Sequence, residues 1–127
     1  MAVDALANAL ALQVDAAALG FDWPDITGVL DNLDEEIAEL REAVEAGDAA
    51  QARREFGDLM FSIVNVSRFV EASPSEEIEA SSQRFKERFE GLKLKLEMAG
   101  RPIRDCTLEE LDEVWEQVKT EIESAGA

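Results

Sequence analysis

The sequence predicts an all-α protein built as a bundle of four or five helices. The 127 residues include only 3 Pro and 7 Gly, the residues that most disfavour helices. Apolar residues recur at spacings of three and four along most of the chain, which places them on single helix faces. No stretch alternates apolar and polar residues in the way a half-buried strand does. We expect one domain, 1–127, with no fused second domain.

The first two predicted helices are separated by the connector FDWPD. An N-terminal amphipathic helix occupies 1–20 and ends near Gly20. The second helix begins near Pro24 and ends near Gly47, because glycine suits the residue that follows a helix. The predicted inward faces are Val3, Leu6, Leu10, Val14, Ala17 and Phe21 in the first helix, and Ile26, Leu30, Leu33, Ile37, Leu40 and Val44 in the second.

Three further helices complete the predicted helical core of residues 21–122, and 123–127 are expected to fray. Asp48, Ser73 and Thr107 are the predicted N-caps of the third, fourth and fifth helices. Gly100 and Pro102 should end the fourth. The sustained spacing of three and four also fits a helical dimer. The predicted inward faces are Phe56, Leu59, Met60, Ile63 and Val70, then Ile78, Phe85, Phe89, Leu92, Leu96 and Ala99, then Leu108, Leu111, Trp115, Val118 and Ile122.

Composition excludes several classes of function. The chain has 29 acidic and 12 basic residues and a formal charge of -17, so we expect it to repel nucleic acid polymers and anionic membranes. It has no histidine, which removes the usual zinc sites and histidine-based catalysis. Its single cysteine, Cys106, cannot form an internal disulfide. No run of about 18 apolar residues spans a membrane, and the N-terminus lacks a basic signal region. We expect a cytoplasmic protein.

Two acidic patterns, EExxE and ExxD, lie on the second and third predicted helices. Glu36 and Glu39 are three residues apart and form a pair beside the predicted core. Asn32 lies one turn earlier on the same side. Glu35 projects towards the back of the helix, as a solvated neighbour.

The third helix carries a second stripe that includes a phenylalanine and an asparagine, so this stripe need not face water. Two antiparallel helices can bring this stripe to the Glu36 pair, where a cation would relieve the repulsion between carboxylates. Ligands that are all oxygen select a hard ion, Mg²⁺ or Mn²⁺. On spacing alone, ordinary solvated acids explain the pattern equally well. The stripe consists of Glu55, Asp58, Ser62, Asn65 and Phe69.

Basic residues gather on the last two helices. Arg84 and Arg88 flank the apolar face of the fourth helix, where they either bind phosphate or pair with Glu87 and Glu90. Gly91, on the same strip, would allow a close approach to the backbone. On the fifth helix, Lys119 either extends past the core or points into a site. Trp115 is either a core residue or a platform for a base.

With these patterns in order, the chain resembles the MazG family of nucleoside triphosphate pyrophosphohydrolases, all-α enzymes related to the dimeric dUTPases. The resemblance covers roughly 21–119. Its motifs are GFDWPDITGVLDNLDEEIAELREAVEAGD, EFGDLMFSIVNVSRF, RFKERFE and LEELDEVWEQVK. It implies hydrolysis of NTP or dNTP to the monophosphate and pyrophosphate with Mg²⁺, or with Mn²⁺ as a substitute.

The resemblance also implies roles for individual residues. The family's metal positions match Glu36, Glu39, Glu55 and Asp58. Without histidine, the expected base is a carboxylate, Glu39 or Glu35. Substrate positions match Asn65, Arg84, Arg88, Trp115 and Lys119. Many family members carry Lys where this chain has Asn32, which cannot supply that charge. The change either weakens phosphate binding or alters substrate preference.

Two other functions stay open alongside nucleotide-pool house-cleaning. One is a dUTPase-like enzyme of narrower specificity. The other is a non-catalytic helical dimer that keeps the family fold. A homodimer is expected, a tetramer is the alternative, and a partner chain could complete the site. The sequence leaves the preferred base, the preferred sugar and the number of metal ions open.

Overall fold

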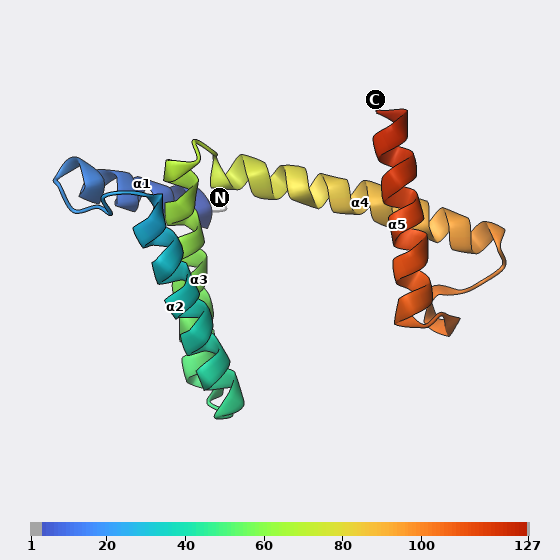
Figure 1. The fold of residues 1–127 in the computed structure, drawn as a ribbon, viewed down its shortest axis with the longest axis horizontal. Helices are drawn as coiled ribbons and strands as arrows, with labels where there is room; N and C mark the ends of the chain where they lie inside the picture. Colours follow the sequence, from blue (N-terminus) through green and yellow to red (C-terminus); the bar gives the residue numbers. More distant parts are fainter. Residues whose placement is uncertain (1–3, 127) are drawn as a thin grey trace. The chain divides into compact units, whose positions relative to one another are not determined.

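The computed structural model describes residues 4–126, and within them it contains helices and no strand (Figure 1), which confirms the all-α prediction. The predictions for Val3 and Ala127 fall outside this part of the chain. The elements are α1 (Ala5–Ala18), α2 (Ile26–Glu45), α3 (Ala49–Phe69), α4 (Pro74–Met98), a 3-10 turn η1 (Ile103–Asp105) and α5 (Leu108–Ala125). No helix within residues 4–126 is long and apolar enough to cross a membrane.

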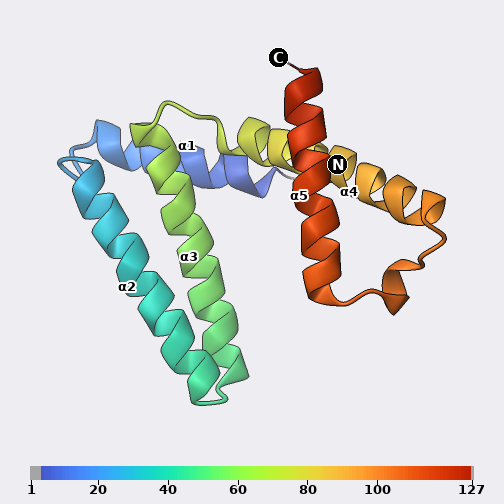
Figure 2. The same cartoon turned by 45° about the vertical axis from the view of Figure 1, so that its right-hand side comes forward.

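The chain forms two compact units, Met1–Glu77 and Ile78–Ala127. In the first, α2 and α3 form an antiparallel hairpin and lie side by side in both views (Figures 1 and 2). Helix α1 packs on α3, and the side chain of Gln13 donates from Nε2 to the carbonyl oxygen of Phe61 at 2.9 Å. The second unit contains most of α4, together with η1 and α5.

The helix boundaries follow the predicted capping signals. Asp48 Oδ1 accepts from the backbone N–H of Gln51 at 3.1 Å, and Ser73 Oγ accepts from that of Glu76 at 3.3 Å. Thr107 forms a full capping box with Glu110. These caps lie within three residues of the groups they satisfy, so local sequence determines them.

Other boundaries differ from prediction. Helix α2 starts two residues after Pro24, because Asp25 caps it by accepting from the N–H groups of Thr27 and Gly28 at 3.0 and 3.3 Å. At the other end of the chain, α5 continues to Ala125, three residues past the predicted end of the core.

Within the first unit, several predicted inward faces point outward. The hairpin closes through a different stripe, which contains buried Val29 and Ala43 on α2 and buried Glu55 and Ser62 on α3. Position on a helix sets which residues share a face, and the neighbouring helices decide which face is covered. The residues predicted to be buried but exposed here are Val14, Phe21, Leu30, Ile37, Val44, Phe56, Met60, Ile63 and Val70.

The second unit has a small core of its own. Leu92, Leu96 and Val118 are buried where α5 packs on α4. Phe85 lies against Trp115 with ring centroids 5.5 Å apart, although about half of its surface stays exposed. Ile78 and Leu108 were predicted to be inward but are exposed, because each lies in the first turns of its helix.

Candidate functional site

A cluster of three carboxylates lies in the groove between α2 and α3. Glu36 and Glu39 come from α2, one turn apart, and Glu55 comes from α3. Each offers an oxygen atom, and these three atoms all lie within 4.8 Å of one another. The antiparallel hairpin therefore brings together residues that are 19 or fewer positions apart, as the predicted convergence of the acidic patterns requires.

Burial leaves part of this cluster without hydrogen-bond partners. Glu55 is only 7% exposed, and its Oε1 accepts from Gln51 Nε2 at 2.6 Å. Its other oxygen, Oε2, is buried and receives no hydrogen bond from any described residue, and the same is true of Glu36 Oε2. Buried polar atoms are rarely unpartnered in native proteins, so these two oxygens call for a ligand.

The electrostatics of the cluster point in the same direction. Desolvation, followed by the charge of Glu39 and then contact with Glu55, raises the pKa of Glu36. Hydrogen-bonding contact with Glu55 and the charge of Glu55 are the main causes that raise the pKa of Glu39. Carboxylates that raise one another's pKa are held closer than their charges favour, which a cation would reverse.

The residues present fit a hard divalent cation. Three carboxylates without histidine or cysteine form an all-oxygen donor set, the type that Mg²⁺ and Mn²⁺ prefer. The two unpartnered oxygens supply free lone pairs for such an ion.

Two other acidic residues lie beside the cluster rather than within it. Asp58 is exposed and is not one of the three residues whose oxygens converge, but its charge raises the pKa of both Glu36 and Glu39. The charge of Glu35 raises the pKa of Glu39 and is not among the causes that raise the pKa of Glu36. Asp58 is thus electrostatically coupled to the whole pair and Glu35 to one member of it.

A cavity of about 520 Å³ opens in the same unit. Asn32 and Ser62 line it, one helical turn from Glu36 and Asp58 respectively, so it continues the groove beyond the acidic cluster. Asn32 Nδ2 donates to Ser62 Oγ at 2.9 Å across the hairpin. Asn65 also lines the cavity, so two of the predicted substrate residues meet there. Its aromatic walls are Phe21, Trp23 and Phe61.

Sequence reasoning missed several residues of this cavity. No sequence pattern singled out Gln13, yet it is buried and lines the cavity. Arg68 lines it too, donating from Nε to Asn65 Oδ1 at 3.0 Å and pairing with Asp22 at 2.6 Å. This pair lowers the pKa of Asp22. Trp23 lies in the FDWPD connector, and an aromatic residue in a loop was the one sequence signal that could have pointed to this cavity.

The remaining predicted substrate residues belong to the second unit. Arg84 donates to Ser81 Oγ at 2.9 Å, and Arg88 lies 4.0 Å from Glu123. The pairing of these arginines with Glu87 and Glu90 that the sequence left open is therefore not seen. Lys119 lies 3.6 Å from Glu116.

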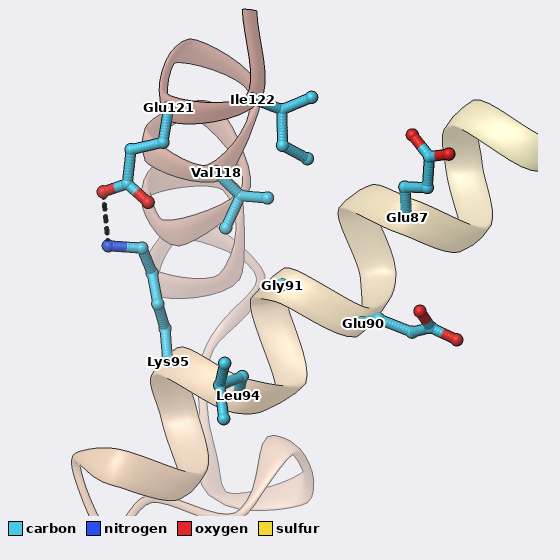
Figure 3. Close-up of a pocket in the computed structure, with 8 residues that line it drawn as sticks. All are labelled: Glu87, Glu90, Gly91, Leu94, Lys95, Val118, Glu121 and Ile122. Carbon is cyan, nitrogen blue, oxygen red and sulfur yellow. Dashed lines mark hydrogen bonds and ion pairs between the residues drawn. The ribbon is translucent and has the colours of Figure 1, made fainter. Parts of the chain in front are cut away.

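Trp115 and Gly91 serve packing in this unit. Trp115 is half-buried against Phe85, as one of its two interpretations required. The close approach to Gly91 is made by α5, since a Cβ added at Gly91 would lie 2.7 Å from Val118 Cγ1. Figure 3 shows Val118 directed towards Gly91 beside the ion pair of Lys95 and Glu121, which are 2.7 Å apart.

Comparison with known proteins identifies the family of the chain. Residues 26–91, about half of the chain, match the model of the MazG nucleotide pyrophosphohydrolase domain. The chain belongs to the MazG family. The matched segment contains the whole acidic cluster as well as Arg84 and Arg88.

Individual relatives extend the match over most of the chain. The nucleoside triphosphate pyrophosphohydrolase/pyrophosphatase MazG of Thermotoga maritima is 40% identical over 117 residues, which are 92% of this chain and 45% of that protein. The nucleoside triphosphate pyrophosphohydrolase of Escherichia coli K12 is 34% identical over 119 residues, 91% of this chain and 44% of its own length. This MazG-family chain thus spans less than half the length of these relatives.

Proposed function

We propose that this chain is a Mg²⁺-dependent nucleoside triphosphate pyrophosphohydrolase that converts NTP or dNTP and water to the monophosphate and pyrophosphate, in the service of nucleotide-pool house-cleaning. The observation that carries the proposal is the three-carboxylate cluster with its two unpartnered buried oxygens. Its family membership and the names of its relatives support the same reaction.

In this proposal the acidic cluster binds the cation and the neighbouring cavity binds the nucleoside. Glu36, Glu39 and Glu55 hold the cation, with Asp58 as a fourth ligand. When bound, the cation neutralises phosphate charge and promotes attack by water. Glu39 is the proposed general base, because the sequence has no histidine and Glu39 is the exposed member of the cluster, and Glu35 is the alternative.

The neighbouring cavity receives the nucleoside. Its volume of about 520 Å³ lies in the range of small-molecule sites, and Phe21, Trp23 and Phe61 offer apolar surface to a base or sugar. Asn32 and Asn65 supply polar contacts there. The triphosphate then extends towards the carboxylates, because the two sites follow one another along the hairpin.

The basic residues of the second unit are proposed to bind phosphate, the role that the family resemblance implies for them. Arg88 and Lys119 now pair with acids that are two-thirds exposed, Glu123 and Glu116. Such exposed pairs contribute little to stability, so phosphate can replace the acids at low cost. Trp115 would support them from the adjacent core. The proposed domain is a single MazG-like one, 1–127, made up of the N-terminal helix 1–20, the catalytic core 21–122 and the tail 123–127.

A homodimer is part of the proposal, with a tetramer as the alternative. On α2, exposed Leu30, Ile37 and Val44 recur every seven residues, and on α3 exposed Phe56 and Ile63 do the same. This is the spacing of helices that pair with other helices, and a two-fold arrangement would bring the same stripe of a second copy against it. The proposed location is the cytoplasm, where nucleoside triphosphates are formed, with no nucleic acid polymer or membrane as partner.

The test is release of pyrophosphate and monophosphate from ordinary and modified NTPs and dNTPs, with Mg²⁺ and with chelator. We expect metal-dependent turnover that Glu39→Gln abolishes while its far-UV circular dichroism and melting temperature show a folded protein. Turnover of dUTP alone would favour the dUTPase-like alternative. No turnover by well-folded protein would favour the non-catalytic dimer, and normal turnover by Glu39→Gln would exclude Glu39 as base and as essential ligand.

A further inference from the structure

Three amide side chains line the cavity, and each has one end held by the protein. Gln13 Nε2 donates to the Phe61 carbonyl, and Asn32 Nδ2 donates to Ser62 Oγ, both at 2.9 Å. Asn65 is held in the opposite sense, because its Oδ1 accepts from Arg68. An amide has one donor end and one acceptor end, so fixing one end determines what the other offers.

Gln13 and Asn32 therefore keep their carbonyl oxygens for a ligand. The oxygen of Gln13 carries most of the argument, since the residue is only 6% exposed and Oε1 is buried. No residue in the described part of the chain donates to it. A buried acceptor without a donor is unfavourable, and because Gln13 lines the cavity, a small rotation of its side chain towards a donor bound there would remove that cost.

The hydrogen bond to the Phe61 carbonyl explains the donor end of the Gln13 amide but not its acceptor end. The neighbours of Gln13 along the same face of α1 are the half-buried Leu10 and Ala17, three residues before and four after it. An apolar side chain of similar length would fill the same space without leaving an acceptor unpaired. The amide is thus better explained by what enters the cavity.

We propose that Gln13 selects the nucleobase, accepting a hydrogen bond from an exocyclic amino group, with Asn32 Oδ1 as the second acceptor. This rests on the proposed function. An amino group carries two N–H donors on one nitrogen and can satisfy two acceptors. A deaminated base has a carbonyl oxygen at that position, which would face two other oxygens. The cavity therefore prefers cytosine to uracil and adenine to hypoxanthine, so the nucleotides to be cleaned from the pool are modified ones that keep the amino group rather than deaminated ones.

The experiment compares kcat/KM for dCTP with dUTP, and for dATP with dITP, in the presence of Mg²⁺. Within each pair the two bases differ in one exocyclic group, which is an amino group in the first and a carbonyl oxygen in the second. We expect wild-type protein to prefer the amino member about tenfold or more, the usual scale for a buried acceptor left unpaired. Gln13→Met, which keeps the length and removes the acceptor, should reduce the ratio towards unity, mainly by lowering KM for dUTP and dITP.

Gln83→Met is the matched control. Gln83 is exposed on α4, so this substitution makes the same chemical change outside the cavity. It should keep the wild-type ratio. Equal or better use of dUTP and dITP by the wild type would overturn the inference without any variant. An unchanged ratio in folded Gln13→Met would also overturn it. Absence of turnover with all four nucleotides would instead overturn the proposed function, and this inference with it.

Discussion

Glu36→Gln should stabilise the protein when no divalent cation is bound. Glu36 and Glu55 offer carboxylate oxygens within 4.8 Å of each other, and each has a buried oxygen without a donor. Two unit charges at that distance repel by about 3 kcal/mol at an effective dielectric constant of 20, and by about 1 kcal/mol in water. Removing the Glu36 charge while keeping its shape should therefore increase the free energy of unfolding by about 1–3 kcal/mol.

This gain should appear as a melting temperature that is higher by roughly 3–10 °C for a domain of this size. The assay is thermal unfolding by circular dichroism at pH 7.5, first with chelator and then with Mg²⁺. Cation binding to the native state should raise the wild-type melting temperature. The variant should respond much less, because it has lost a ligand.

Glu42→Gln is the control for the change in net charge. Glu42 is exposed on the same helix and lies outside the cluster. It should change the melting temperature little, with the response to Mg²⁺ intact. If Glu36→Gln were destabilising in chelator, or kept the full response to Mg²⁺, the argument for a strained cation-binding cluster would be wrong.

Three further predictions follow from other parts of the molecule. Gly91→Ala should destabilise the protein by about 1–2 kcal/mol in urea unfolding, because the new Cβ would lie 2.7 Å from Val118. Gly57→Ala is the control: open space surrounds Gly57, so this substitution should stabilise the protein by up to about 1 kcal/mol. The Thr107 backbone, followed by Arg101, lowers the pKa of Glu110 from 4.5 to about 2. The unfolded chain then binds more protons between these values, so stability falls as pH drops from 4.5 to 2, and Glu110→Gln should lessen that fall in urea titrations. Ile63→Glu places a charge on the exposed stripe of α3 and should convert the proposed dimer to a monomer, as measured by sedimentation velocity. A wild-type protein that already sediments as a monomer would refute the proposed interface.

Local features of the fold were predictable because their causes are close in sequence. Asp48, Ser73 and Thr107 cap the helices they were expected to cap, since each side chain reaches an N–H three residues ahead. The convergence of Glu36 and Glu39 with Glu55 was predictable for a similar reason. A three-residue spacing fixes a helix face, and a short turn forces the next helix to run back alongside it.

Long-range features were not predictable in the same way. Helix α3 has two stripes that contain apolar residues, and periodicity alone favoured the one with Phe56 and Ile63. The structure covers the stripe with Glu55 and Ser62 instead, because that stripe faces α2. Gln13 gave no periodic signal at all, since its role depends on Phe61, 48 positions away.

Asn32, where many members of the family carry Lys, lies in the groove at the boundary between the acidic cluster and the cavity. Along α2, Glu39, Glu36 and Asn32 follow one another at about one turn each, and α3 runs the other way with Glu55 opposite the acids and Ser62 opposite Asn32. A lysine at position 32 would extend the charged section by one turn. Asn32, tied to Ser62, instead belongs to the neutral amide section that lines the cavity. In the proposed function, Asn32 therefore contacts the nucleoside rather than the phosphates, and we expect altered base preference rather than loss of catalysis.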